Sequence, residues 1–335
     1  MSYDANVFRR AVQRLAEERT QREELQRRRQ EEIFKKIPRA AEIDRQLRRT
    51  IIELIRSALS RGSDPVAALQ TVRDKNLGLQ AEQAELLAAH GYPIDALNSR
   101  PACPRCGDTG WVGSEMCRCL EALCAQEQIK ELSKLLDLGG QTFDLFSLDY
   151  YSDQPWTGET VPPRENMEFI RDVCWSYAER FGVFPVKNLF LTGSPGLGKT
   201  FLSACIARVV SEKGHSVVYD TAVQIFNTFE AQKFSRDAED TQQAQKETHQ
   251  YLRCDLLILD DLGSEMTTPF VQSALYTLIN TRLTAGRHTV ISSNLSMDEV
   301  RRRYAGQVAS RLEGEYRPLC FYGEDVRQLR KLAPV

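Results

Sequence analysis

The sequence of 335 residues lacks long hydrophobic runs. No stretch approaches the roughly 18 consecutive apolar residues that cross a bilayer, and the first residues carry no apolar core of a signal peptide. Net charge is nearly absent as well, because the formal value at pH 7 is −2, which gives no bulk attraction to nucleic acid. We therefore expect a cytoplasmic protein that does not interact with membranes.

Glycine is missing from residues 1–60, where Pro38 is the one proline. Residues 1–61 contain 16 Lys and Arg against 10 Asp and Glu, a local excess of 16 − 10 = 6 positive charges. Apolar residues recur at helical spacing, and Glu and Arg often lie four residues apart, as Glu18 and Arg22 do. This pattern predicts helices with two open interpretations: an ordinary solvated face, or an arm that binds a partner through helix contacts.

Composition changes several times along the chain. Residues 64–91 predict two or three short helices, residues 100–125 are rich in cysteine and glycine, and residues 140–165 are irregular. We divide the chain into a helical partner-binding region (1–99), a cysteine-rich module (100–125), a linker (126–165) and an α/β domain (166–335).

Four of the nine cysteines form two close pairs. Cys103 and Cys106 are separated from Cys117 and Cys119 by ten residues, with glycines among them. Two thiol pairs joined by a glycine-rich turn are typical of a tetrahedral zinc site, and a site filled by four cysteines is structural rather than catalytic. No histidine lies between Cys103 and Cys124. Cys124 is a reserve candidate for a zinc ligand. Unligated thiols or a redox pair remain the alternatives.

One loop has the pattern G-x-x-x-x-G-K-[ST] between an apolar run and a helical pattern. Its glycines allow backbone N–H groups to point at phosphate oxygens, and the following helix adds the positive end of its dipole. Lys199 is expected to reach the β- and γ-phosphates and Thr200 to bind Mg²⁺. The alternative is a glycine-rich turn that fits by chance. The predicted ATP-binding residues of the loop are Gly193, Ser194, Pro195, Gly196, Leu197, Gly198, Lys199 and Thr200.

Strands and helices alternate from about residue 166 onward, which predicts a parallel sheet wound by helices. A polar segment, residues 235–250, precedes an apolar strand that ends in two carboxylates, Asp260 and Asp261. This is the Walker B arrangement: Asp260 is expected to hold Mg²⁺ and Asp261 to orient the attacking water. Glu265 is a second candidate for the latter role.

Another strand, residues 289–293, ends at Asn294. A polar amide beside the γ-phosphate completes a water-positioning set, and here the chain resembles the AAA+ ATPases, in which this position is called sensor 1. The resemblance implies that Arg311 is an arginine finger acting on a neighbouring subunit's ATP and that Arg327 is sensor 2. Surface arginines without a role in the reaction are the alternative for both.

The chain resembles most the DnaC/DnaI-type helicase loaders and the related transposition helper IstB. The resemblance covers roughly residues 140–332. Its segments are Gln141–Phe146, Gly193–Thr200, Leu259–Gly263, Ser292–Asn294 and Arg311–Leu312. It implies an AAA+ P-loop ATPase that self-associates through its ATPase domains and binds the replicative hexameric helicase. It also implies that the protein helps to place this helicase on single-stranded DNA in DNA replication, at initiation or restart. The cysteine module resembles the zinc region of DnaI-type loaders but departs from a pattern that contains a histidine ligand.

Three alternatives stay open. An IstB-like transposition helper generally has only a short N-terminal extension, whereas this chain has about 100 residues of helical arm and cysteine module. A zinc-stabilised adaptor that uses nucleotide only as a structural switch is disfavoured by the intact Asp260 and Asp261. A metabolic P-loop kinase would not account for Asn294, Arg311 and the cysteine module together.

Overall fold

The computed structural model describes residues 3–59, 65–132, 135–136, 138, 140–304 and 306–332; within these, the side chains of residues 51–75 are not described. Contacts divide the chain into two compact units. One comprises Met1–Val12 and Arg118–Val335, and the other comprises Gln13–Cys117. Within the described ranges, no helix combines the length and the apolar character needed to cross a membrane.

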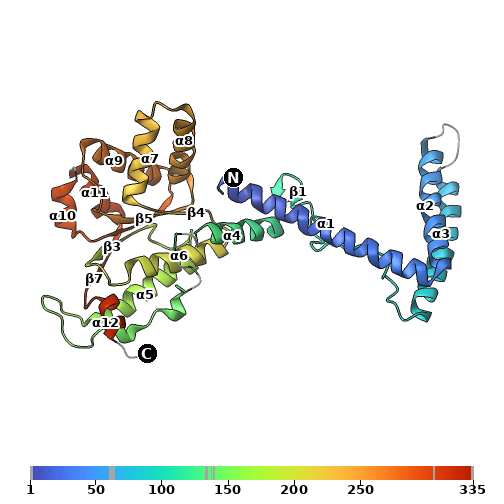
Figure 1. The fold of residues 1–335 in the computed structure, drawn as a ribbon, viewed down its shortest axis with the longest axis horizontal. Helices are drawn as coiled ribbons and strands as arrows, with labels where there is room; N and C mark the ends of the chain where they lie inside the picture. Colours follow the sequence, from blue (N-terminus) through green and yellow to red (C-terminus); the bar gives the residue numbers. More distant parts are fainter. Residues whose placement is uncertain are drawn as a thin grey trace. The chain divides into compact units, whose positions relative to one another are not determined.

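A parallel sheet of five strands forms the centre of the first unit, in the order β4-β5-β6-β3-β7 (Figure 1). The strands are β3 (Asn188–Gly193), β4 (Val217–Thr221), β5 (Leu256–Leu262), β6 (His288–Ser293) and β7 (Arg317–Phe321). Because all pairs are parallel, the carboxyl ends of the strands lie at one edge, and the loops after β3, β5 and β6 meet there. The predicted α/β class with a parallel sheet is confirmed.

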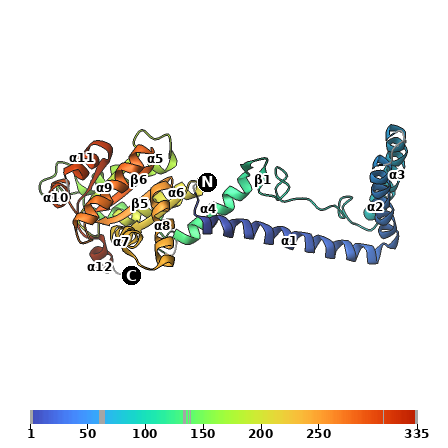
Figure 2. The same ribbon diagram turned by 90° about the horizontal axis from the view of Figure 1, so that it is seen from above.

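Both faces of the sheet are buried, which explains the continuous apolar runs in its strands. Leu189 and Leu191 of β3 belong to one hydrophobic cluster, whereas Phe190 between them belongs to the other. Helices α5 (Pro163–Glu179) and α6 (Lys199–Glu212) cover the first face. The second face is covered by α7 (Ala222–Phe234), α8 (Ala238–Arg253), α9 (Pro269–Thr284), α10 (Met297–Arg303) and α11 (Gly306–Glu315), while α12 (Val326–Leu332) follows β7 (Figures 1 and 2).

Helix α8 lies where the sequence indicates only a polar segment. Asp237 caps it by accepting hydrogen bonds from the N–H groups of Glu239 and Asp240. The helix buries a narrow stripe, Ala244, Thr248 and Tyr251, and leaves the rest of its surface polar. So few apolar positions give a weak helical signal, although the cap and the acidic first turn are typical of a helix start.

Helix α4 (Arg118–Leu132) begins inside the cysteine module, with Cys119 in its first turn, and packs on α6 and β4 of the α/β domain. The buried Gln128 amide donates to Ser211 Oγ at 2.9 Å and to His215 O at 2.8 Å, and its oxygen accepts from Val217 N at 2.9 Å. The predicted linker 126–165 therefore starts inside a helix, and it continues through the short 3₁₀ helices Phe143–Leu145 and Leu148–Tyr150. The boundaries of the four domains remain predictions.

The second unit is mainly helical. Helix α1 (Ala5–Lys36) contributes all but its first residues to this unit, and α2 (Pro38–Leu59) and α3 (Pro65–Ala89) lie side by side (Figures 1 and 2). Arg39 of α2 makes a bidentate ion pair with Glu82 of α3 at 2.7 and 3.1 Å. The helical N-terminal region is confirmed, but the prediction of two or three short helices over 64–91 is wrong, since the single helix α3 runs unbroken from Pro65 to Ala89. The short strands β1 (Trp111–Val112) and β2 (Glu115–Met116) lie between the two cysteine pairs.

Candidate functional site

The loop after β3 has a backbone that only glycine adopts easily. Gly193, Gly196 and Gly198 have φ angles of 141°, 81° and 94°. A Cβ atom on Gly193 would lie 2.1 Å from the carbonyl oxygen of Phe321, so a larger residue would clash with the neighbouring strand β7. Gly198 ends the loop and directly precedes Lys199, the first residue of α6. The loop therefore brings its N–H groups and the N-terminus of α6 together, as phosphate binding requires.

Lys199 is folded back onto the loop. Its Nζ atom donates to Gly193 O at 2.6 Å, to Ser194 O at 2.9 Å and to Asn294 Oδ1 at 2.8 Å. Burial lowers the pKa of Lys199 to about 8, and the neighbouring Asp261 and Asp260 oppose this effect only in part. Its three donor positions thus meet three acceptors, which a triphosphate would have to replace.

Asp260 is surrounded by hydroxyl groups. Its Oδ2 atom accepts from Thr200 Oγ1 at 3.1 Å and from Tyr219 OH at 2.7 Å, and its Oδ1 atom accepts from Ser292 Oγ. A carboxylate and a hydroxyl oxygen this close together suit a hard divalent cation, which prefers oxygen ligands. Thr200 and Asp260, the two predicted magnesium ligands, are therefore neighbours in space as well as chemically matched to the ion.

Asp261 differs from Asp260 in backbone and in environment. Its φ angle is 55°, a left-handed conformation that is uncommon outside glycine, and its N–H donates to Ser292 Oγ at 3.0 Å. Burial raises the pKa of its carboxyl and the charge of Asp260 adds to this, while Lys199 and Arg327 work in the opposite direction. A raised pKa makes the carboxylate a better proton acceptor for an attacking water.

The carboxylate of Glu265 is buried, and both of its oxygens accept hydrogen bonds from groups of the protein. One oxygen accepts from Gly263 N at 2.8 Å and the other from the hydroxyl of Tyr304. Arg303 adds bonds to Glu265 O at 2.6 Å and to Thr267 Oγ1 at 2.7 Å. Glu265 therefore fastens the loop after β5 to the end of α10, and this arrangement does not suit the water-positioning role considered for it.

The two predicted arginines lie on different helices. Arg327, on α12, is exposed, and its charge influences the pKa of both Lys199 and Asp261. Arg311, on α11, is half-buried, and its side chain makes no hydrogen bond or ion pair with any residue that the structure describes. Asn294 and Arg327 thus belong to the surroundings of Lys199, whereas no contact among the described residues connects Arg311 to the phosphate loop.

Residues that precede the α/β domain in sequence pack against the phosphate loop. Tyr151 donates from its hydroxyl to Leu197 O at 3.0 Å, and its ring stacks on Phe146 with 5.8 Å between centroids. A Cβ atom on Gly198 would meet both of these side chains. Neither Tyr151 nor Tyr219 belongs to a sequence pattern that predicts a role, so sequence reasoning missed them; only the spatial neighbourhood reveals them.

The four predicted metal-binding cysteines gather in one place. The Sγ atoms of Cys103, Cys106, Cys117 and Cys119 all lie within 4.8 Å of one another, and those of Cys103 and Cys117 are 3.7 Å apart. Sulfur atoms about 2.3 Å from a tetrahedral zinc ion would be about 3.8 Å apart, so the donor set fits zinc. Cys124 lies outside this cluster in α4, and burial, followed by the charge of Glu121, raises its pKa to about 11.

Asp108 holds the first cysteine pair in place. Its carboxylate accepts from Cys103 N at 2.8 Å, from Ala102 N at 3.0 Å and from Arg22 at 3.1 Å. Burial alone would raise the pKa of Asp108, but the two N–H groups and Arg22 outweigh burial and lower it. A charged carboxylate behind a ligand-bearing loop is a common support for a metal site.

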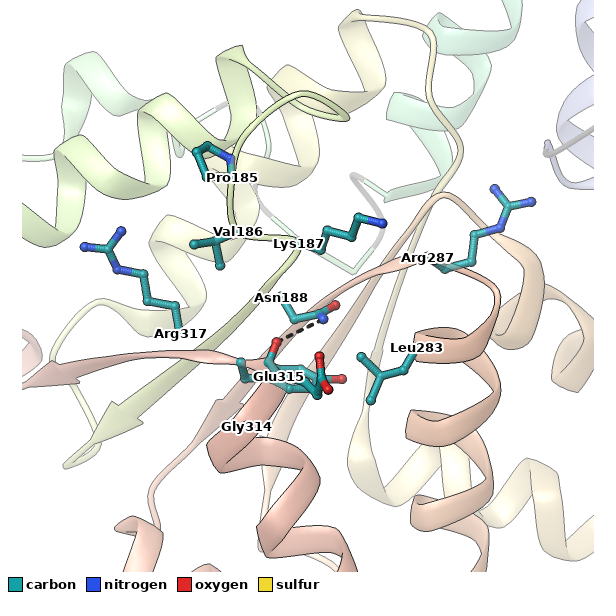
Figure 3. Close-up of a pocket in the computed structure, with 11 residues that line it drawn as sticks. Pro185, Val186, Lys187, Asn188, Leu283, Arg287, Gly314, Glu315 and Arg317 are labelled. Atoms are coloured by element: carbon teal, nitrogen blue, oxygen red, sulfur yellow. Dashed lines mark hydrogen bonds between the residues drawn. The ribbon is translucent and has the colours of Figure 1, made fainter.

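A cavity of about 540 Å³ opens at the opposite edge of the sheet, where β3, β6 and β7 begin (Figure 3). Three basic residues line it, Lys187, Arg287 and Arg317. Each lies near the carboxyl end of a helix, where a positive charge complements the helix dipole. Figure 3 shows Arg287 and Arg317 extending to opposite sides, so their charges do not converge on one ligand. The cavity is separate from the phosphate loop and takes no part in the site described above.

The strand order, the loop after β3, the acids that end β5 and the amide after β6 define a P-loop domain of the AAA+ type. Residues 183–309 match the protein family described as IstB-like ATP binding protein. This match confirms the prediction of an ATP-binding domain of the ATPase class. Arg311 and Arg327 lie beyond its end.

Two curated relatives each match a little over a third of the chain. The uncharacterized protein YdaV of Escherichia coli K12 is 24% identical over 37% of this chain and 48% of its own length. The replicative helicase loader DnaI of Bacillus subtilis is 31% identical over 35% of this chain and 36% of its own length. The chain thus spans half or less of these relatives. Among solved structures, the DnaC helicase loader is 21% identical with a TM-score of 0.42, over 54% of this chain and 98% of that one.

Proposed function

We propose that this protein is an ATP-dependent loader that binds the replicative hexameric helicase and helps to place it on single-stranded DNA. The observation that supports this best is the pair of contacts from Lys199 to Asn294 and from Thr200 to Asp260, in a chain that is 31% identical to the helicase loader DnaI over 124 residues. The geometry suits ATP hydrolysis, and the similarity suggests the process in which it is used.

In the proposed reaction, Lys199 leaves its loop carbonyls and binds the β- and γ-phosphates, while the loop N–H groups hold the phosphate oxygens. Thr200 and Asp260 would hold Mg²⁺, which neutralises charge on the phosphates when it is bound. Asp261 accepts a proton from the attacking water and Asn294 orients this water. Arg311 from a neighbouring subunit and Arg327 neutralise the charge that develops on the leaving phosphate.

Self-association follows from this scheme, because Arg311 has no partner in its own described chain and would act on the ATP of the next subunit. Residues 1–99 are proposed as the helicase-binding region, because they are helical and carry excess positive charge in their first 61 residues. The module at 100–125 would bind structural Zn²⁺ through its four cysteines, because a segment this short has too little core to fold without a metal. Residues 166–335 are proposed as the ATPase domain.

The experiment is a pull-down with the tagged Asp261→Asn variant, which is expected to bind ATP without hydrolysing it. With ATP present, we expect recovery of the replicative helicase from a host lysate, and loss of this recovery when residues 1–99 are removed. Recovery of a transposase instead would favour the alternative, an IstB-like transposition helper. Recovery of DNA without a helicase would also contradict the loader proposal.

A further inference from the structure

Tyr219 lies on β4, outside every motif that defines the site. Its phenol reaches across to the neighbouring strand β5 and donates to Asp260 Oδ2 at 2.7 Å. The side chains of both residues are buried, at 9% and 3% exposure. A buried hydrogen bond between a neutral donor and a charged acceptor is stronger than one between two neutral groups.

Asp260 has three hydroxyl donors, and they are not equivalent. Thr200 Oγ1 is the group that the loop's chemistry assigns to Mg²⁺, so its hydroxyl would have to serve the ion through its oxygen and Asp260 Oδ2 through its hydrogen. The hydroxyls of Tyr219 and Ser292 come from the two strands that flank β5, and they remain on opposite oxygens of the carboxylate. They are therefore the groups that can fix the orientation of Asp260 without taking part in metal coordination themselves.

We infer that Tyr219 is a positioning residue that holds Asp260 ready for Mg²⁺ together with ATP. The inference rests on the proposed function, because it assumes that Thr200 and Asp260 hold the ion. The phenol stays protonated and remains a donor, since burial and the charge of Asp260 raise the pKa of Tyr219 far above neutral pH. Without it, Oδ2 would keep only Thr200 as a hydrogen-bond donor, and Thr200 would have to coordinate the metal as well.

The chain offers a matched control. Tyr251 also donates to a carboxylate oxygen at 2.7 Å, that of Asp220, and it is likewise buried. Asp220 has no place in the proposed metal site. The variants Tyr219→Phe and Tyr251→Phe therefore remove equivalent hydroxyls, and only the first of them acts on the proposed magnesium ligand.

The test measures binding of a fluorescent, non-hydrolysable ATP analogue by the full chain, first without metal and then during titration with Mg²⁺. For Tyr219→Phe we expect the Mg²⁺ concentration at half-saturation to rise roughly 10- to 100-fold, as is usual for loss of a group that supports a metal ligand. Metal-free affinity should stay within about twofold of the wild type, and Tyr251→Phe should match the wild type in both measurements. The same shift is expected in the Mg²⁺ dependence of hydrolysis.

A double variant separates positioning from a change in the fold. In an Asp260→Asn background, Tyr219→Phe should produce no further shift, because the residue it acts through is already altered. A Tyr219→Phe variant with wild-type Mg²⁺ dependence, or with weakened metal-free binding, would overturn the inference alone. A wild-type protein whose nucleotide affinity does not respond to Mg²⁺ would overturn the proposed function together with it.

Discussion

Lys199 and Asn294 are joined by a hydrogen bond of 2.8 Å between Nζ and Oδ1, which links the phosphate loop to the end of β6. Lys199, which is expected to bind the phosphates, is thus hydrogen-bonded to Asn294, which is expected to sense the γ-phosphate. When a triphosphate takes Lys199, the Asn294 amide is released and can turn to the γ-phosphate or to the attacking water. In the proposed reaction, this bond would couple ATP binding to the assembly of the hydrolytic site.

The lowered pKa of Lys199 predicts that ATP binding takes up a proton in alkaline solution. The pKa of Lys199 is about 8 in the folded protein without nucleotide and about 10.5 in the unfolded chain. Folding therefore disfavours the charged form of this side chain. Phosphate oxygens stabilise the ammonium group and raise this pKa. Uptake of up to one proton is therefore expected at about pH 9 and none from Lys199 at about pH 6, and ATP affinity should fall as pH rises through 8.

Calorimetry at these two pH values, in buffers of different ionisation enthalpy, measures the proton uptake. The Lys199→Ala variant serves as the reference and should lose ATP binding altogether. Equal heats in all buffers at pH 9, or an unchanged ATP affinity in Lys199→Ala, would contradict the assignment of Lys199 to the phosphates.

Arg311→Ala should bind ATP normally and lose hydrolysis by about 10³-fold or more, the effect usual for an arginine finger. Mixing it with Asp261→Asn should restore part of the activity, because some interfaces then combine an intact Asp261 with an intact Arg311. Arg301→Ala is the control, since Arg301 is exposed and pairs only with Asp298 and Glu313 in the described chain. Steady-state phosphate release is the measurement, and a mixture with no gain over its components would argue against a shared site.

Glu265→Gln separates the two carboxylates considered for the attacking water. Since both oxygens of Glu265 bind groups of the protein, we expect the variant to melt at a lower temperature and to retain hydrolysis within about tenfold of the wild type. Asp261→Asn should keep its stability and lose turnover. Thermal unfolding and phosphate release on the same preparations test this; a stable, inactive Glu265→Gln protein would return the catalytic role to Glu265.

Much of the candidate site could be predicted because its residues are contiguous in the sequence and form recognisable motifs. The residues of the phosphate loop and the two acids of β5 are constrained by close backbone approach and by charge, and both constraints are visible in the sequence. Helix α8 gave a weaker signal because only Ala244, Thr248 and Tyr251 are buried. Tyr219 and Glu265 could not be assigned, since their roles depend on partners 41 and 39 positions away.

Asp108→Ala should reduce zinc affinity roughly 10- to 100-fold, because the N–H groups of Cys103 and Ala102 lose their acceptor. Asp108→Asn should lose less, since it keeps one oxygen and tolerates the φ angle of 63° at this position. Cys124→Ala should leave one zinc per chain. Competition with a chromogenic chelator measures all three; a loss of zinc in Cys124→Ala would mean that Cys124 replaces one of the four clustered ligands.

The central claim is tested most directly by loading the purified replicative helicase of the same organism onto circular single-stranded DNA. Helicase retained on the circle is measured after gel filtration, with the wild-type protein and with Lys199→Ala, in the presence of ATP. The account predicts many-fold more retained helicase with the wild type, and none above background with Lys199→Ala or with residues 1–99 removed. If the wild type, Lys199→Ala and the protein without residues 1–99 all gave the same helicase retention, the account would be contradicted. The same holds if the wild type gave no more retention than a reaction without this protein.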